Sequence, residues 1–387
     1  MIKKEISEIK RQFTNEHCTI TRLCGCYVDG EKRKMAEIKE AFLSLPEDEI
    51  FKYFEIFRKS LSGTLGKNLI NMEFPKNLDF QGTSQAFLYQ LRESRLTNPE
   101  LLESFYDKVI ETYDYVGNYL ILLIHAAYDV PGKTSDGIEM NDASDEVYEY
   151  ILCCICPVNL SKAGLSYDAE TNTFRNRIRD WIVELPETGF LFPAFNDRST
   201  DIYSLLYYAK NAEMLHDMFI HDFLGCTLPL SAGTQKETFH SLIADTLGPA
   251  CEYEVVKNIH DKLNEMIEEH KDIPQPLLLE KEKVKTLFAD SGVENSVLNQ
   301  FDETYEKHFS HIPEPERPAL IATNLTNSRT FEIKTPEVVI KVNPERTNLV
   351  DTRIIDGKRC IVIEITDEVS VNGISLSMQA TPDQQDL

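Results

Sequence analysis

The chain has 387 residues, with 40 lysines and arginines against 64 aspartates and glutamates, which gives a formal net charge of −24. Hydrophobic residues make up 42% of the chain and charged residues 27%, and 20 phenylalanines with 16 tyrosines are enough to fill a sizeable core. This composition excludes a wholly disordered chain, a collagen-like fibre and a small disulfide scaffold, but it names no reaction.

The first third of the chain predicts helices and one β-hairpin. Apolar residues near the start recur at spacings of four, three and four, which is typical of an amphipathic helix. A strand-forming segment then reaches an Asp-Gly turn, and two later segments begin with residues that suit the start of a helix. The predicted elements are a helix over 2–13, strands over 19–28 and 32–38 joined at Asp29-Gly30, a helix that begins at Pro46 and is ended by Gly63, and a helix over 99–111 capped by Asn98.

The middle of the chain predicts a sheet followed by helices. Residues 119–127 and 147–158 are nearly continuous apolar runs with the length of buried strands, and the polar segment 129–145 between them predicts a loop. Strands followed by helices favour an α+β fold, with a mixed or antiparallel central sheet flanked by helices, over repeated βαβ units. The remaining predicted elements are a hairpin of 165–167 and 173–174, an apolar segment over 189–195, and helices over 200–210, 212–224, 235–247 and 253–270.

Prolines and a change of composition mark the C-terminal part. Short β-rich runs follow the last prolines, and Asp356-Gly357 and Asn372-Gly373 predict tight turns between them. We therefore expect five segments. They are an α+β main domain over 1–272, a pair of short helices within 273–310, a proline-containing linker over 311–328, a small β-rich module over 329–377, and a disordered tail over 378–387.

The negative charge is concentrated in one part of the chain. Residues 97–325 hold 17 basic and 40 acidic side chains, whereas residues 1–96 hold 16 basic and 14 acidic ones. A field of that sign repels phosphate backbones, so nucleic-acid binding is disfavoured and acidity for solubility is the simplest explanation. A local basic patch in the first 96 residues still has the charge to bind an anion.

The location of the protein is predicted from its apolar runs and its cysteines. The first eight residues contain no apolar segment of a secretory signal, and the longest apolar run, 119–127, falls short of the roughly 20 residues that span a bilayer. We expect no signal peptide and no membrane insertion. The nine cysteines are an odd number, so reduced thiols in the cytoplasm are the simplest expectation.

One glycine-rich segment is a weak candidate for a phosphate-binding loop. Gly63, Gly66 and Lys67 resemble part of such a loop, but Leu61 stands where a Walker loop has its first glycine, and Asn68 stands where it has a hydroxyl. Glycines that end a helix and form a loop explain the same residues. The identity of any cofactor stays open.

Polar side chains follow two apolar runs of the predicted sheet. His125 and Asp129 lie at the end of the first run, and Asp197, Arg198 and Asp201 follow the segment 189–195. Catalytic groups are often carried on loops at the ends of a rigid sheet, where a histidine and carboxylates act as acid and base or hold a divalent metal. The second group also reads as the start of a helix over 200–210, with Ser199 or Thr200 as its N-cap.

Several long stretches of the chain resemble a known family. They are GTLGKNL at 63–69, GNYLILL at 117–123, DASDEV at 142–147, GFLFPAF at 189–195 and VVIKVNPER at 338–346. With them, the chain up to about residue 376 resembles family 4317 of the domains of unknown function, which is typical of clostridial-type Gram-positive bacteria. The resemblance implies a bacterial, cytoplasmic protein and carries no functional residue.

Two functional hypotheses remain. The first is a protein-binding or regulatory factor without catalytic activity, since the sequence has no complete catalytic motif and carries a β-rich module after a proline linker. The alternative is a metal-assisted hydrolase or phosphoesterase. In it, His125 is a metal ligand or general base, Asp129, Asp197 and Asp201 hold the metal, and Arg198 contacts an anion. The oligomeric state stays open in both.

Overall fold

The structure is a computed structural model. It describes residues 1–75, 80–133, 139–310, 312, 317–327, 330–365, 369–371 and 374–376. For residues 133, 139–145 and 376 it describes the backbone alone. The chain divides into two compact units. Unit 1 consists of Met1–Glu237 and Asp272–Pro276, and unit 2 of Thr238–Lys271 and Leu277–Leu387. The division into five segments that we expect from the sequence stays a prediction.

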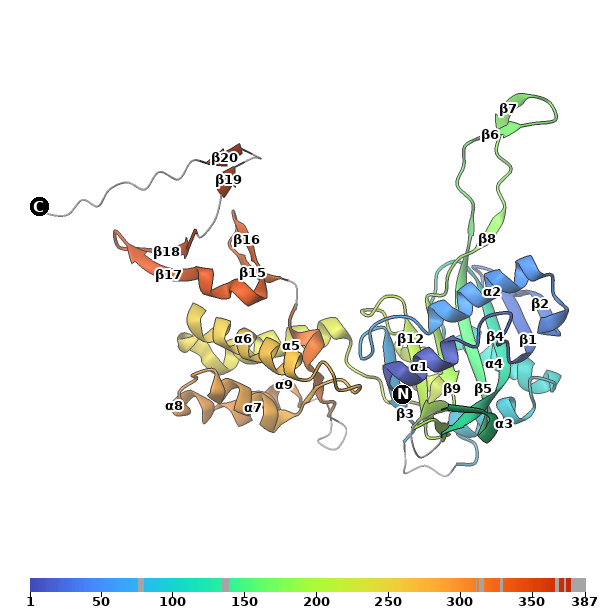
Figure 1. Cartoon of the computed structure of the whole chain (residues 1–387), viewed down its shortest axis with the longest axis horizontal. Coiled ribbons are helices and arrows are strands. Elements are labelled where there is room, and N and C mark those ends of the chain that lie inside the picture. Colours follow the sequence, from blue (N-terminus) through green and yellow to red (C-terminus); the bar gives the residue numbers. More distant parts are fainter. Residues whose placement is uncertain are drawn as a thin grey trace, which may run out of the picture. The chain divides into compact units, whose positions relative to one another are not determined.

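An antiparallel sheet forms the centre of unit 1 (Figure 1). Every pair of neighbouring strands in it runs antiparallel, and β8 (Trp181–Val183) pairs with the end of β5. In spatial order the strands are β2 (Lys34–Glu40), β1 (Ile20–Val28), β4 (Asn118–Lys133), β5 (Glu139–Leu160), β9 (Thr188–Phe192), β12 (Ser204–Ala209) and β3 (Leu69–Glu73).

Both faces of this sheet are buried, which explains the continuous apolar runs of its central strands. Successive side chains of a strand point to opposite faces, so Ile121 and Leu123 enter one hydrophobic cluster while Leu120 and Leu122 enter the other. The predicted buried strands over 119–127 and 147–158 are confirmed as parts of β4 and β5.

Helices cover the two faces. On the first face lie α3 (Ser84–Glu93), α4 (Pro99–Thr112) and the π-helix η2 (Phe219–Leu224), and on the second lie α1 (Lys3–Lys10), α2 (Glu47–Ser60) and the short η1 (Phe42–Ser44). The predicted N-cap is confirmed, because Asn98 accepts hydrogen bonds from the backbone N–H groups of Glu100 and Leu101. The predicted helix over 2–13 is shorter in the structure, and the helix predicted from Pro46 is confirmed as α2.

Three predictions in unit 1 need correction. The segment 200–210 is not a helix: it contains β11 (Ser199–Asp201) and β12, which lies between β9 and β3 with all six residues buried. The segment 129–145 is not a loop throughout, since β4 continues to Lys133 and β5 begins at Glu139. The sequence predicts a helix over 212–224, and within this segment residues 219–224 form the π-helix η2.

Two small hairpins complete unit 1. β10 (Ala194–Asn196) pairs with β11, and β6 (Leu165–Asp168) pairs with β7 (Thr173–Asn176), which confirms the hairpin predicted there. Figure 1 shows β6 and β7 at the end of a long ribbon that leaves the sheet next to β8.

Unit 2 combines packed helices with exposed hairpins. Its helical core contains aromatic contacts such as Phe239 with Phe288 and Phe301 with Tyr305. Its helices are α5 (Ala232–Leu247, which begins in unit 1), η3 (Gly248–Ala250), α6 (Tyr253–Glu269), α7 (Lys281–Asp290), α8 (Asn295–Leu298), α9 (Phe301–His308), α10 (Ala322–Leu325) and η5 (Pro344–Leu349). Its strand pairs are β13 (Leu278–Leu279) with β14 (Leu320–Ile321), β15 (Phe331–Lys334) with β16 (Val339–Val342), β17 (Val350–Ile355) with β18 (Lys358–Ile363), and β19 (Val369–Val371) with β20 (Ile374–Leu376).

The fold class predicted from the sequence, α+β with a central sheet and a β-rich C-terminal end, is confirmed. The turn at Asp356-Gly357 is confirmed between β17 and β18. Asn372-Gly373 and the tail 378–387 lie outside the described residues, as do residues 311, 313–316 and 328 of the predicted linker, whereas its residues 320–325 form β14 and α10. In the described part of the chain, no helix combines the length and the apolar character that crossing a bilayer requires.

Candidate functional site

The first candidate residue, His125, lies in a buried polar network near the middle of β4. Its side chain is 0% exposed, and its Nδ1 lies 2.8 Å from the Thr21 hydroxyl, which also donates to the His125 backbone carbonyl. Its Nε2 lies 3.6 Å from Glu149 Oε2, and Glu149 accepts a 2.6 Å hydrogen bond from Arg95. This network connects β1, β4, β5 and the end of α3 across the edge of the core.

Asp129 does not join this network. It follows His125 by four residues on the same strand, so their Cα atoms lie roughly 13 Å apart, and Asp129 is exposed where His125 is buried. Two side chains separated in this way do not meet at one metal ion, whose ligands lie at about 2 Å.

The second candidate group forms the hairpin of β10 and β11. Asn196 pairs with Ser199, which leaves Asp197 and Arg198 as a two-residue turn with φ angles of 51° and 59°. The alternative reading of Ser199 or Thr200 as a helix N-cap is therefore wrong. Both hydroxyls instead donate to the carboxylate of Glu146 on β5.

The carboxylate of Asp201 is held by its own hairpin. It accepts hydrogen bonds from Asn196 Nδ2 at 2.6 Å, from the Ser204 hydroxyl at 2.7 Å and from the Tyr203 backbone N–H at 2.9 Å. Partial burial raises the pKa of Asp201, but these hydrogen bonds together hold it below the ordinary value. These three donors occupy positions that a metal ion would otherwise need.

The sheet separates the two groups. His125 has the same strand parity as Ile121 and Leu123, so it belongs to the face covered by α3 and α4. Arg198 contacts Glu8 of α1, and the β10 residue Phe195 belongs to the hydrophobic cluster of the opposite face. Within the described residues, no group of three or more His, Cys, Asp or Glu side chains is placed to hold a metal ion. We base no proposal on a joint site of these residues.

The glycine-rich segment between α2 and β3 forms a closed turn. The N–H of Gly66 donates to Leu69 O at 2.7 Å, and those of Lys67 and Asn68 donate to Thr64 O. Gly63 and Gly66 have φ angles of 148° and 80°, which glycine adopts without strain. A phosphate-binding loop needs its N–H groups to point at the ligand, and here they are used within the turn.

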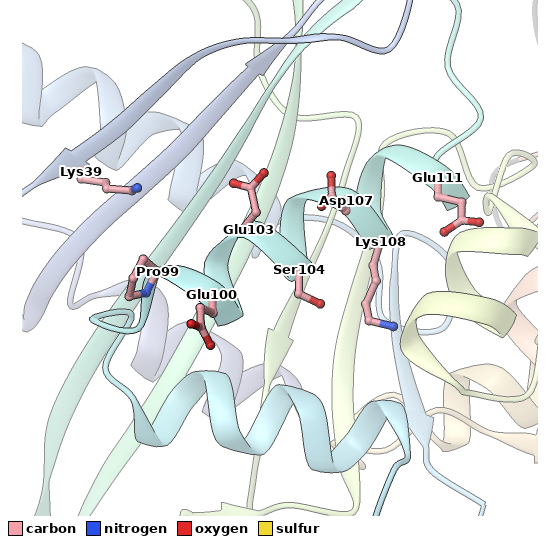
Figure 2. A pocket seen from close by; sticks show the side chains of 8 residues that line it. All are labelled: Lys39, Pro99, Glu100, Glu103, Ser104, Asp107, Lys108 and Glu111. Carbon is pink, nitrogen blue, oxygen red and sulfur yellow. The ribbon is translucent and has the colours of Figure 1, made fainter.

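A groove of about 700 Å³ runs along the outer side of α4. Figure 2 shows Glu103 and Asp107 on one side of the helix and Lys108 on the other. Lys34 forms ion pairs with both Glu103 and Asp107, and the Lys108 ammonium lies 5.5 Å from the ring centre of Phe87. The groove is a solvated surface with partly balanced charges, and its acidic side chains alone define no ligand.

The most unusual surface of unit 1 is the segment between β5 and β9, residues 161–187, which we call the arm. It is the extended end of a hairpin, because β8 pairs with the last residues of β5 and β9 pairs with the residues before them. Arg177 N–H donates to Gly164 O, and Ser161 N–H donates to Asp180 O. The two strands of the arm are therefore tied to each other beyond the edge of the sheet.

The arm exposes large apolar side chains that a soluble surface normally hides. Leu165 is 76% exposed, Phe174 is 73% exposed, and Trp181, the single tryptophan of the chain, is 56% exposed. The hairpin in the arm is predictable from the sequence, whereas its exposed apolar surface is not, because exposure cannot be derived from composition. The exposed apolar residues of the arm are Leu165, Tyr167, Phe174, Ile178, Trp181, Ile182, Val183 and Leu185.

Acidification is expected to weaken unit 1 through His125. Burial lowers the pKa of His125 below its ordinary value of 6.5, with Glu149 opposing this shift, so the unfolded chain takes up a proton more readily than the folded one. Stability is complete above pH 6.5 and falls below it, by at most about 1.4 kcal/mol per pH unit for this group.

The measurement is urea unfolding of the wild type and of His125→Gln at several pH values between about 7.5 and 5. The difference in slope isolates His125 from His216, whose pKa burial also lowers. Identical pH dependence of the two proteins would contradict the prediction.

Comparison with known proteins identifies the family of the chain. No curated protein matches it. The model of the family described as Domain of unknown function (DUF4317) matches residues 1–374, which covers both units up to the last hairpin. This match confirms the resemblance seen in the sequence. The chain belongs to the DUF4317 family.

Proposed function

We propose that this protein is a non-catalytic protein-binding factor that binds its partner through the arm. The observation that carries the proposal is the set of eight exposed large apolar side chains in residues 161–187. Burying a Leu, Ile or Phe side chain stabilises a complex by about 1.5–3 kcal/mol, and aromatic residues such as Trp181 are frequent centres of binding energy. Covering this surface with a partner would therefore contribute a large favourable free energy of binding.

The charges of the arm describe the partner further. Residues 161–187 hold four basic and five acidic side chains, and two of the basic ones are engaged within the arm: Arg175 pairs with Asp168, and Arg179 Nε donates to Ser161 O. The arm thus fits a protein with an apolar groove rather than a strongly charged surface. A second copy of this chain is less suited, since each copy carries a charge of −24.

Replacing three apolar residues of the arm is expected to abolish capture of the partner. The variant carries Leu165→Ser, Phe174→Ser and Ile178→Ser, and the loss should reach about 4 kcal/mol, or roughly 1000-fold in affinity. The matched control carries Leu43→Ser, Phe51→Ser and Val116→Ser, which are exposed residues elsewhere on unit 1. Immobilised wild type, arm variant and control are compared by capture from lysate with quantitative mass spectrometry.

A protein captured by the wild type and the control, but not by the arm variant, supports the proposal once its binding is reproduced with purified components. Trp181 then reports the contact directly, because its fluorescence is the tryptophan signal of the whole chain and should shift to shorter wavelength as the partner excludes water. Equal capture by the arm variant and the control contradicts the proposal. So does self-association of the wild type that the arm variant loses, measured by light scattering.

A further inference from the structure

A second surface of unit 1 differs from the rest of the chain in its charge. A cavity of about 540 Å³ lies beside α1, and we call it the α1 pocket. Most of its lining comes from α1 and the turn that follows it, with one residue each from β4 and from the segment 272–276. The lining residues are Lys3, Lys4, Ser7, Glu8, Arg11, Gln12, His17, Tyr128 and Pro274.

The α1 pocket is cationic in a strongly acidic protein. Lys3, Lys4 and Arg11 contribute three positive charges, and His17 adds an imidazole ring. In the part of the chain that the structure describes, no ion pair is formed by these three cations, whereas Lys34, Lys39 and Arg33 of the hairpin of β1 and β2 each pair with a carboxylate. Their positive charge is therefore available to a ligand.

The single carboxylate of the pocket, Glu8, is already engaged. Glu8 Oε1 accepts hydrogen bonds from Arg198 Nη2 at 3.0 Å, from Arg198 Nε at 3.2 Å and from the Tyr128 hydroxyl at 3.0 Å. Because the guanidinium balances the charge of this carboxylate, Glu8 does not cancel the field of the lysines and Arg11. The Glu8 carboxylate and the Arg198 guanidinium thus form a neutral, hydrogen-bonded pair at the pocket, and the charges of Lys3, Lys4 and Arg11 stay unbalanced.

The structure holds Arg198 in place at a cost in backbone energy. Two-residue turns with positive φ at both positions usually contain Asn and Gly, and here they contain Asp197 and Arg198. Arg198 also donates to the carbonyl of Pro131 at 3.1 Å, which fixes its guanidinium from a second side. Strain of this kind persists where the surrounding contacts over-determine it, and it is concentrated at ligand sites.

We propose that the α1 pocket binds a small phosphate-bearing anion with at least two phosphate charges. Three free cations and the side-chain amide of Gln12 offer charge-assisted hydrogen bonds to such a group, and arginine and lysine are the residues that bind phosphate best. A volume of 540 Å³ lies within the range of small-molecule sites. This site is independent of the arm and of the function proposed for it.

The test is isothermal titration of the full-length protein with inorganic triphosphate at about 50 mM salt, where exposed charges are weakly screened. The double variant Lys4→Gln, Arg11→Gln is expected to bind at least about tenfold more weakly, since each removes a charge-assisted hydrogen bond. The matched control is Lys32→Gln, Lys52→Gln, which removes the same charge from exposed lysines elsewhere on unit 1 and should leave the affinity within about twofold of the wild type.

A variant with the opposite expected sign makes the test sharper. Glu8→Gln removes the negative charge of the pocket while keeping an amide oxygen for Arg198, and it should tighten triphosphate binding by about threefold or more. A merely structural role of these residues would weaken binding in every variant. Circular dichroism of each variant confirms that the fold is retained.

Three results would overturn the proposal. The first is that triphosphate does not bind at about 1 mM, and the second is that the double variant and its control bind triphosphate with the same affinity. The third is that citrate binds as tightly as triphosphate, because the pocket would then select its ligand by charge alone. Triphosphate binding that Lys4→Gln, Arg11→Gln weakens and Glu8→Gln strengthens supports it. Because none of these substitutions touches residues 161–187, this outcome is separate from that of the arm experiment.

Discussion

Gly189→Ala is expected to destabilise unit 1 by about 3 kcal/mol or more. Gly189 lies in β9 between β5 and β12, and a Cβ atom there would stand 2.3 Å from the backbone carbonyl oxygen of Cys153. A side chain could move away from such a contact, but this atom belongs to the paired backbone of the central strand. The strands must therefore separate, and ladder hydrogen bonds are lost.

Hydrogen exchange of peptides from β4 and β5 measures this effect, and the exchange of their slowest amides should accelerate by about 100-fold. Gly164→Ala is the matched control, because an added Cβ there has no atom within 4 Å and its expected effect is below about 0.5 kcal/mol. Equal exchange in the two variants would show that β5 and β9 do not approach each other as described.

Phe219→Ala is expected to cost about 3–5 kcal/mol. Phe219 is fully buried in η2, and its ring lies 5.1 Å from that of Phe223 and 6.1 Å from that of Tyr113, measured between centroids. Removing it leaves a cavity at the place where η2 covers the sheet, and the rigid aromatic neighbours limit how far this cavity can collapse.

The same substitution in the arm provides the control. Phe174 is 73% exposed, so Phe174→Ala should change the free energy of unfolding by less than about 0.5 kcal/mol. Urea unfolding followed by circular dichroism compares the two variants. A loss of stability in Phe174→Ala as large as that in Phe219→Ala would mean that the arm is part of the core, and the proposed role of its side chains would fail with it.

The strongly patterned parts of the fold were predictable from the sequence. The apolar runs that became β4 and β5, the Asp-Gly turns, and the Asn98-Pro99 helix start each depend on local residues. Local signals of this kind specify an element without its partners. The sheet order, in which β9 and β12 insert between β5 and β3, depends on contacts between distant segments and was not open to the same reasoning.

The wrong predictions have physical reasons. Leu205, Leu206, Tyr207 and Tyr208 are buried on both faces of the sheet, and a short apolar run of this kind has no period that distinguishes a strand from a buried helix. Residues 129–133 predict a loop because polar residues, a proline and a glycine usually mark one. In the structure they continue β4, with Asp129 exposed on one side of the strand and Val130 buried on the other, so the strand is longer than its continuous apolar run.

The candidate sites were predictable only in part. A cationic side of the first helix is visible in the sequence, since Lys4 and Arg11 are seven residues apart, which places them on one side of a helix. Arg198 and Tyr128 reach the same place from segments more than 100 residues away. The exposed apolar surface of the arm was not predictable for another reason: its leucine, phenylalanine and tryptophan residues look like core residues until their exposure is known.

The route of the chain through the arm has an evolutionary consequence. It leaves the sheet at the end of β5 and returns through β8 to β9, which is the next strand over, so a short turn joining the two neighbours would preserve every other pairing of the sheet. Insertions, deletions and substitutions can therefore accumulate in this excursion while the scaffold is conserved. Family members that retain the same scaffold are therefore expected to differ most in the length and sequence of this segment.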